Sequence, residues 1–212
     1  MRKTIVFGSI LILATLVLVG AGCGEKEPGE ESLTDILNKA KDVTSFKYDM
    51  IATTPGETAI TTTMWRKGEK MRMEGTFEGQ SMVYLVDAGE QLAYMYFPAE
   101  NTAMTIDLSQ AQETAGDSPT EQSGSVLDYN PVTLGTEVLD GKTCLVIEYT
   151  NETGETKMWL WTRYGFPIRT EITTAQGTSV VELKNIDFGN ISDSIFELPA
   201  GVQLMTIPSF GF

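Results

Sequence analysis

The stretch Ser81-Met-Val-Tyr-Leu-Val-Asp87, followed after a turn by Leu92-Ala-Tyr-Met-Tyr-Phe97, decides the fold. Both segments are short and rich in aromatic or β-branched residues, which is typical of strands. Successive residues of a strand point to opposite faces of the sheet, and here both faces are apolar. The sheet must therefore be covered on both sides at this point, or line a cavity.

The same pattern of short strand and tight turn runs through most of the chain. Turn signals such as Pro55-Gly56, Glu78-Gly79 and Asp140-Gly141 separate the segments, as in antiparallel hairpins. The expected strands are Ser45–Thr54, Glu57–Lys67, Lys70–Phe77, Ser81–Asp87, Gln91–Phe97, Ala103–Leu108, Val132–Leu139, Lys142–Thr150, Glu155–Thr162, Ile168–Thr174 and Thr178–Phe188. About eleven strands with hardly a helix between them exclude a parallel βαβ sheet.

One amphipathic helix is expected before the first strand. Ser32-Leu-Thr-Asp35 has the form of a capping box, and apolar residues follow at helical spacing as far as Val43. One short helix cannot cover a sheet of this size. We therefore predict a mainly β fold, in which a single strongly curved antiparallel sheet forms a half-open barrel with the helix across its mouth.

The polar stretch 109–125 interrupts this rhythm. It has few apolar residues and no clear period, and long loops inside compact domains are usually functional or disordered. The sequence predicts a mobile loop here. A lid over a pocket is the functional alternative.

The N-terminus carries the features of a lipoprotein signal. Arg2 and Lys3 precede the apolar run Ile5–Val19, and the small residues Gly20-Ala21-Gly22 lead to Cys23. We predict a signal peptide over 1–22, acylation of Cys23, a flexible tether over 23–31 and one domain over 32–212. Such a protein is anchored by lipid on the extracytoplasmic face of a cell membrane. Ordinary cleavage and an uncleaved anchor are the alternatives.

Composition narrows the function. The formal net charge of −14 disfavours nucleic-acid binding, because the phosphate backbone is also anionic. Histidine is absent, which removes Ser-His-Asp catalysis and imidazole metal ligands. Cys144 lies in an apolar run and is expected to be a small buried side chain. The sequence thus predicts no catalytic residue, no metal and no cofactor, and it leaves the oligomeric state open.

Methionine is unusually frequent, with 10 residues, most of them on expected strands. Its flexible, polarisable side chain suits a surface that accepts varied apolar ligands, and tryptophan adds large apolar area. Filling of an irregular core is the alternative. The residues expected to line a ligand cavity are Met64, Met71, Met73, Met82, Tyr84, Met95, Trp159 and Trp161.

Several motifs in the C-terminal half resemble the LolA/LolB-like superfamily of lipoprotein carriers and lipid-binding lipoproteins. They follow in the order Leu139-Asp-Gly-Lys-Thr-Cys-Leu-Val-Ile-Glu148, Lys157-Met-Trp-Leu-Trp161, Gly165-Phe-Pro-Ile-Arg169, Phe188 and Phe196-Glu-Leu-Pro199. The resemblance implies a half-open barrel that holds acyl chains in an apolar cavity. Thr162 departs from the acidic residue usual at its position, and soluble carriers of the superfamily lack an acylated cysteine.

These features together predict a non-enzymatic, membrane-anchored lipoprotein. Its partners would be a lipid or the acyl chains of another lipoprotein, and the membrane through its anchor. The alternative is an envelope sensor or interaction module that uses the same fold to regulate a membrane partner.

Overall fold

The computed structural model describes residues 31–109 and 118–206. The predicted signal peptide, Cys23 and the tether up to residue 30 lie outside the described residues. The helices are α1 (Leu33–Ala40) and α2 (Pro119–Ser125), and the short 3-10 turns are η1 (Val126–Tyr129) and η2 (Asp193–Phe196). The strands are β1 (Ser45–Thr53), β2 (Ile60–Lys67), β3 (Lys70–Phe77), β4 (Gln80–Asp87), β5 (Leu92–Phe97), β6 (Thr102–Asp107), β7 (Val132–Leu139), β8 (Lys142–Asn151), β9 (Gly154–Trp161), β10 (Phe166–Thr174), β11 (Gly177–Asp187) and β12 (Gln203–Thr206).

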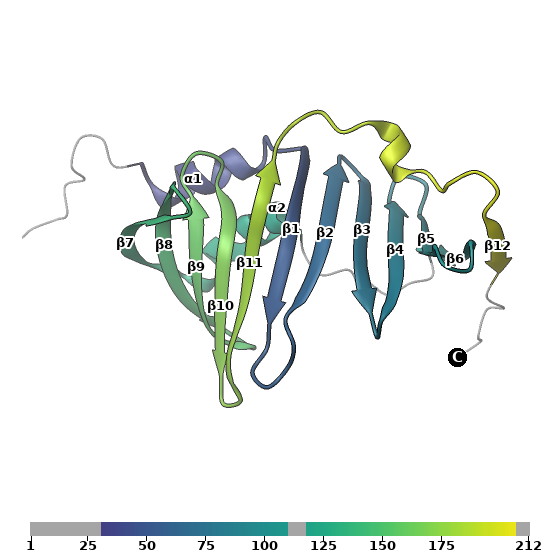
Figure 1. Cartoon of the computed structure of the whole chain (residues 1–212). Coiled ribbons are helices and arrows are strands. Elements are labelled where there is room, and N and C mark those ends of the chain that lie inside the picture. The colour runs from purple at the N-terminus through teal and green to yellow at the C-terminus, as the bar shows by residue number, and fades with distance from the viewer. Residues whose placement is uncertain (1–30, 110–117, 207–212) are drawn as a thin grey trace, which may run out of the picture. The chain divides into compact units, whose positions relative to one another are not determined.

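All these strands belong to one open sheet in the order β12-β6-β5-β4-β3-β2-β1-β11-β10-β9-β8-β7 (Figure 1). The predicted mainly β fold with one curved, half-open sheet is confirmed. The strand count differs slightly from the expected eleven, because the described sheet has 12 strands. The additional strand, β12, pairs with β6 in parallel, whereas the other pairs are antiparallel. Most of these join consecutive strands in hairpins, and the pair of β1 and β11 joins the two halves in the middle of the open sheet. Four-residue β12 carries no strong strand pattern, so its pairing depends on the tertiary fold.

The two faces of the sheet are covered by different elements. We call the face on which α1 and α2 lie the inner face, and in Figure 1 both helices lie behind the sheet. Ile36 and Leu37 of α1 pack there with Val126 against a buried group from β8 and β9, namely Ile147, Met158 and Leu160. The predicted helix is confirmed, and its N-terminus has the expected capping box of Ser32 and Asp35. The helices thus cover the inner face over the β8–β10 half.

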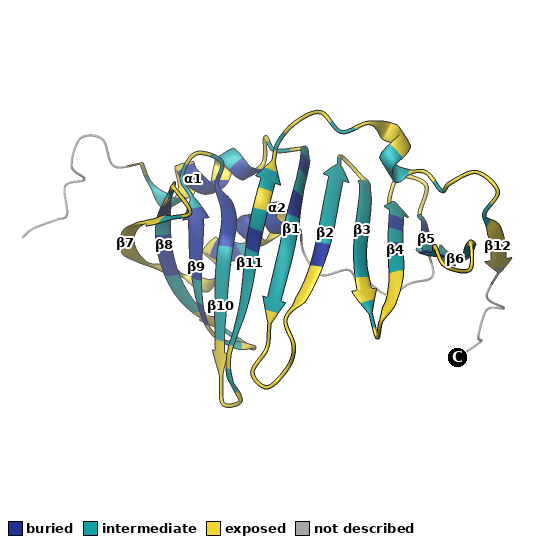
Figure 2. Ribbon diagram, in the orientation of Figure 1, coloured by how far each residue is buried: buried dark blue, intermediate teal, exposed yellow. Residues whose placement is uncertain are grey.

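The other half of the sheet is covered from the opposite side. After β11 the chain crosses the outer face, where Leu198 and Val202 pack against Val83, Leu85 and Tyr96 of β4 and β5. We call residues 188–206 the C-terminal arm. Figure 2 shows the consequence: buried residues concentrate in the helices and β8–β10, whereas β2–β4 are largely of intermediate exposure. The inner face of β2–β6 therefore lies beyond the buried core under the helices.

The second half of the stretch 109–125 differs from its predicted loop structure. It forms α2, with a capping box of Ser118 and Glu121 and Pro119 in the first turn. Ser123 is fully buried, and its single hydroxyl hydrogen is shared between the carbonyl oxygens of Gly165 and Pro119, at 2.8 and 3.0 Å from Oγ. A small hydroxyl whose hydrogen bond is satisfied can enter a core without an apolar side chain. Residues 110–117 lie outside the described residues.

Within the residues that the structure describes, no helix has the length and apolar character needed to cross a bilayer.

Candidate functional site

The inner face of β2–β6 carries a continuous row of methionine and tyrosine side chains. Hairpin register places Met64 opposite Met73, Met73 opposite Tyr84, Tyr84 opposite Met95 and Met95 opposite Met104. Side chains of directly opposed residues lie on the same face and contact one another. We call Met64, Met73, Tyr84, Met95 and Met104 the methionine row. It crosses five neighbouring strands without a charged residue.

Both ends of the row are extended by further apolar side chains. Buried Tyr48 of β1 lies opposite Met64, and exposed Met205 of β12 lies opposite Met104. Met71 and Met82 occupy neighbouring positions on the same face, since they lie two residues from Met73 and Tyr84 on their own strands. Six of the eight residues predicted to line a ligand cavity therefore lie together on the inner face.

The two predicted tryptophans lie on the other face. Trp159 is opposite Arg169 and next in sequence to Met158, whose side chain packs under the helices on the inner face. Adjacent strand residues point to opposite faces, so Trp159 belongs to the outer face. Trp161 lies two residues after Trp159 in the same strand and so shares its face. Its ring contacts the rings of Tyr164 and Phe188. The structure thus separates both tryptophans from the methionine row.

The residues of the row are partly exposed rather than enclosed. Two grooves of the described structure lie elsewhere. One, of about 430 Å³, is lined by residues near the end of α1 and in the β9–β10 turn, including Val43, Arg163 and Tyr164. The other, of about 250 Å³, lies between the C-terminal arm and the outer-face residues Leu85 and Tyr94. The methionine row is therefore an open apolar surface and not part of either groove.

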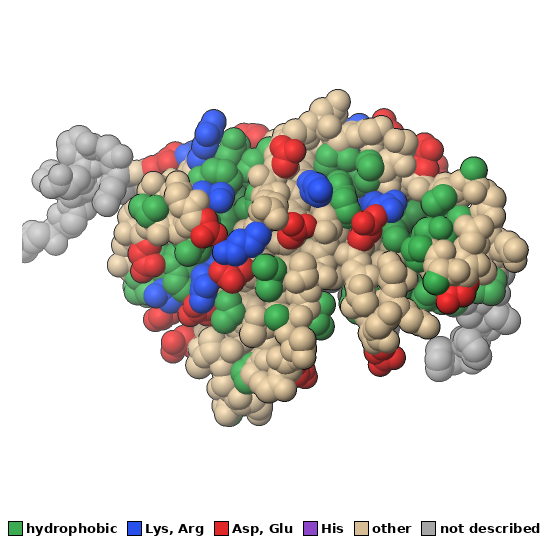
Figure 3. All heavy atoms as spheres, in the orientation of Figure 1, with side chains coloured by type: hydrophobic (Ala, Val, Ile, Leu, Met, Phe, Trp, Pro, Cys, Tyr) green, Lys and Arg blue, Asp and Glu red, His purple; other side chains and the backbone are tan. Residues whose placement is uncertain are grey.

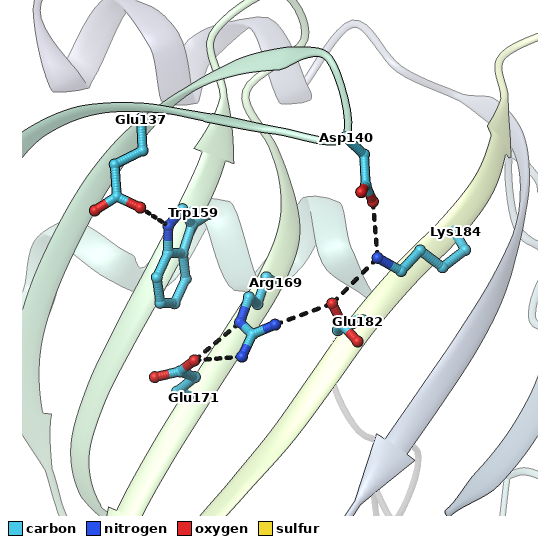
Figure 4. A network of polar contacts seen from close by, with 7 residues as sticks. All are labelled: Glu137, Asp140, Trp159, Arg169, Glu171, Glu182 and Lys184. Atoms are coloured by element: carbon cyan, nitrogen blue, oxygen red, sulfur yellow. Dashed lines mark hydrogen bonds and ion pairs between the residues drawn. The ribbon is translucent and has the colours of Figure 1, made fainter.

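The outer face of β9–β11 holds a chain of ion pairs (Figure 4). Arg169 donates hydrogen bonds to Glu171 at 2.6 and 2.9 Å and to Glu182 at 3.0 Å, and Lys184 bridges Glu182 and Asp140 at 3.1 and 2.7 Å. The hydrogen bond to Asp140 raises the pKa of Lys184, and the same bond lowers the pKa of Asp140.

The indole nitrogen of Trp159 belongs to the same face and donates to Glu137 at 2.8 Å. Figure 3 shows basic and acidic side chains interleaved over these strands. Arg169, Lys184, Glu171, Glu182 and Asp140 each lie in an ion pair with a group of opposite charge, and Glu137 accepts the hydrogen bond of the indole. We therefore interpret the network as a polar support for the sheet and not as a ligand site.

One charged residue on the inner face was not predicted as a site residue. Arg66 of β2 lies opposite Met71 and two residues from Met64, so it shares the face of the methionine row. Its Nη2 and Nη1 atoms lie 3.2 and 3.4 Å from the two carboxylate oxygens of Glu121 in α2. The alternation Met64-Trp65-Arg66 in the sequence indicated this placement, because residues two apart in a strand share a face.

The described residues contain no group of three or more His, Cys, Asp and Glu side chains placed to hold a metal ion. Cys144 is fully buried, and burial raises the pKa of its thiol to about 11. A thiol with so high a pKa is protonated at neutral pH and is a poor nucleophile.

No family model matches the sequence, and no curated protein sequence matches it. Solved structures share the fold. An uncharacterised conserved protein from Thermus thermophilus has a TM-score of 0.59 at 10% identity, over 84% of this chain and 100% of that chain. MucB has a TM-score of 0.53 at 15% identity, over 82% of this chain and 66% of its own. LprF from Mycobacterium bovis has a TM-score of 0.50 at 13% identity, over 80% and 97% of the two chains. The fold implied by the LolA/LolB-like resemblance is thereby confirmed.

Proposed function

Since the chain has the half-open curved-sheet fold of the LolA/LolB-like superfamily, we propose that it binds lipids or lipoprotein acyl chains on the methionine row. The observation that carries this proposal is the unbroken register from Met64 to Met104. It aligns flexible apolar side chains across five strands on a face that the helices leave uncovered. Methionine adapts its shape to the ligand, so such a surface suits acyl chains of varied length.

The dimensions of the row agree with this ligand. Neighbouring strands lie about 4.8 Å apart, so five strands span about 19 Å. One acyl chain occupies about half of the roughly 30 Å hydrocarbon core of a bilayer. An extended chain therefore fits along the row. Each methylene removed from water contributes about 0.8 kcal/mol, which is the driving force for uptake.

We further propose that the protein is a non-enzymatic lipoprotein anchored through acylated Cys23 on the extracytoplasmic side of a membrane. The signal layout in the sequence supports this proposal. Mass spectrometry of the protein from native membranes tests it. The expected N-terminal peptide begins at Cys23 with acyl chains attached, and a Cys23→Ala variant should be released from the membrane. An unmodified Cys23, or a variant that stays on the membrane, would contradict the anchor.

Ligand uptake is tested with delipidated protein and a fluorescent fatty acid. The double variant Met73→Gln/Met95→Gln should bind at least about tenfold more weakly, because each ligand contact then meets a polar amide. The matched control Met73→Leu/Met95→Leu keeps the row apolar and should bind as the unchanged protein does. Folded protein that takes up no fatty acid, phospholipid or lipopeptide would overturn the proposal. Recovery of a membrane signalling protein regardless of lipid loading would instead favour the sensor function.

A further inference from the structure

Arg66 has an exceptional position among the charged residues of the sheet. Residues that are paired across neighbouring strands lie on the same face of the sheet. The pairing therefore assigns a face to each charged side chain across the whole sheet, from edge strand β7 to edge strand β12. Among the paired strand positions of residues 31–109 and 118–206, Arg66 is the one charged side chain on the inner face. The other charged residues of these strands lie on the outer face. A lone cation beside an apolar row requires an explanation.

The immediate surroundings of Arg66 combine apolar and polar contacts. Across β2 and β3 it lies opposite Met71, and across β1 and β2 it lies opposite buried Phe46. Its Nε donates to the carbonyl oxygen of Gly68 at 3.3 Å. Its positive charge also acts on Tyr48, although burial dominates there and raises the pKa of that phenol to about 12. The guanidinium thus lies where the apolar inner face ends and solvent begins.

An anion from within the chain already occupies the fork of the guanidinium. Both carboxylate oxygens of Glu121 face Arg66, in the two-point arrangement by which arginine binds carboxylates and phosphates. The Glu121 side chain is 53% exposed, and that of Arg66 is 28% exposed. An ion pair so accessible to water contributes little to stability, and a competing anion can replace one partner.

Hydrogen bonds from Ser118 and from Arg66 lower the pKa of Glu121. The carboxylate is therefore ionised at neutral pH. The position that it occupies beside the Arg66 guanidinium is one that suits a negatively charged oxygen group.

We infer that Arg66 binds the anionic head group, a carboxylate or a phosphate, of an amphipathic ligand whose acyl chain lies on the methionine row. The inference rests on the proposed function and names the class of ligand. Glu121 occupies the same position before the ligand arrives and competes with it. The methionine row then provides affinity for the chain, and Arg66 provides preference for a charged head over a neutral one.

Three ligands with the same sixteen-carbon chain test this inference, namely hexadecanoate, hexadecyl phosphate and neutral 1-hexadecanol. Dissociation constants are measured by displacement of a fluorescent fatty acid, below the concentrations at which the ligands form micelles. The unchanged protein should bind at least one of the two anions about tenfold more tightly than the alcohol. The preferred anion identifies the carboxylate or the phosphate as the natural head group.

Two variants of the ion pair should change the preference in opposite directions. Arg66→Gln should remove the preference for the anion and leave the Kd of hexadecanol unchanged. Glu121→Gln should tighten binding of the anion about threefold without affecting hexadecanol, because the internal competitor is lost. Arg163→Gln, which changes an exposed arginine outside the row, is the matched control and should change none of the three constants.

Two results would overturn the inference. One is equal affinity of the unchanged protein for the anions and the alcohol. The other is an Arg66→Gln variant that weakens all three ligands alike, which would show a structural role. Failure of the proposed function has a different result, since none of the three ligands would then bind to folded protein.

Discussion

The Oγ atom of Ser123 donates a hydrogen bond of 2.8 Å to the carbonyl oxygen of Gly165, 42 positions further along the chain. This bond joins α2 to the turn between β9 and β10, and the Ser123 side chain is fully buried. The same turn is in contact with α1, because a Cβ atom at Gly165 would meet the carbonyl oxygen of Ile36 at 2.1 Å. Gly165 is therefore the point at which both helices are fastened to the inner face.

Replacement of Ser123 by alanine should destabilise the domain. The variant loses the hydrogen bonds to Gly165 and Pro119 and leaves a buried carbonyl oxygen without its donor. We expect a loss of about 1–2 kcal/mol in the free energy of unfolding, measured by urea denaturation. Ser125→Ala is the control, since the Ser125 Oγ donates to the carbonyl oxygen of Gln122 at the surface. Equal effects of the two variants would contradict the fastening role of Ser123.

Gly165→Ala should be more damaging than a glycine substitution at an open turn. The residue has φ of +65° and its new Cβ would collide with the backbone of α1. We expect a loss of more than about 2 kcal/mol in stability. Gly141→Ala is the matched control, because Gly141 has φ of +71° with nothing within 4 Å of the added Cβ. The Gly141→Ala variant should lose about 1 kcal/mol from backbone strain alone. The difference between the stability losses of the two variants then measures the collision with α1.

Trp159→Phe tests the assignment of the two faces. The variant loses the 2.8 Å hydrogen bond from the indole to Glu137, and stability should fall by about 1 kcal/mol. Binding of a fluorescent fatty acid should be unchanged, because the side chain lies on the outer face. Met73→Gln, on the inner face, should instead weaken binding of the fatty acid. If Trp159→Phe weakens binding as much as Met73→Gln does, the ligand does not lie on the inner face.

Asp49 should make stability depend on pH under acidic conditions. Hydrogen bonds from Asn185 at 2.7 Å and Thr63 at 2.8 Å lower the pKa of this carboxyl from its ordinary value of 3.8. A lowered pKa in the folded state contributes stability that is present above the ordinary value and is lost as pH falls through the folded value. Urea midpoints measured from pH 6 to pH 2.5 should therefore fall less in Asp49→Asn. Thr63→Val removes one donor and should give an intermediate slope. If the urea midpoint of Asp49→Asn falls with pH as steeply as that of the unchanged protein, Asp49 is not the source of the pH dependence.

Cys144 should be unreactive in the folded protein. It is fully buried, and burial raises the pKa of its thiol from 9.0 to about 11. Iodoacetamide at pH 8 should leave Cys144 unmodified in native protein and modify it fully in urea, as read by mass spectrometry of a Cys23→Ser variant. Because the folded pKa is raised, the contribution of the thiol to stability is lost as pH rises from about 9 towards 11. Rapid labelling under native conditions would contradict the buried position.

Local patterns predicted most strands with accuracy. The expected strands Lys70–Phe77 and Val132–Leu139 coincide with β3 and β7, because turn residues mark both ends of each. The capping box at Ser32 likewise marked the start of α1. α2 was missed, since its seven residues are polar or small and form no apolar stripe. Its place depends on the bond between Ser123 and Gly165, which connects distant parts of the chain.

The candidate site was predicted only in part, because it too depends on contacts between distant parts of the chain. Alternation along one strand relates Met71 to Met73, and it also relates Met64 to Arg66. It does not state which face the helices or the C-terminal arm will cover. Trp159 and Trp161 were therefore assigned to the ligand site with the methionines, although the structure places them on the outer face. Arg66 was missed because its importance comes from the absence of other charges on its face in the described strands.

The sequence by itself determined the strands, their turns and the alternation that keeps Met71, Met73 and their neighbours on a common side, because these properties depend on residues close together in the chain. Only the tertiary structure decided the register that joins Met64 to Met104, the covering of opposite faces by the helices and the C-terminal arm, and the pairing of Arg66 with Glu121. The physical reason is that burial and ion pairing depend on which distant surfaces meet. Local propensity carries no information about that choice.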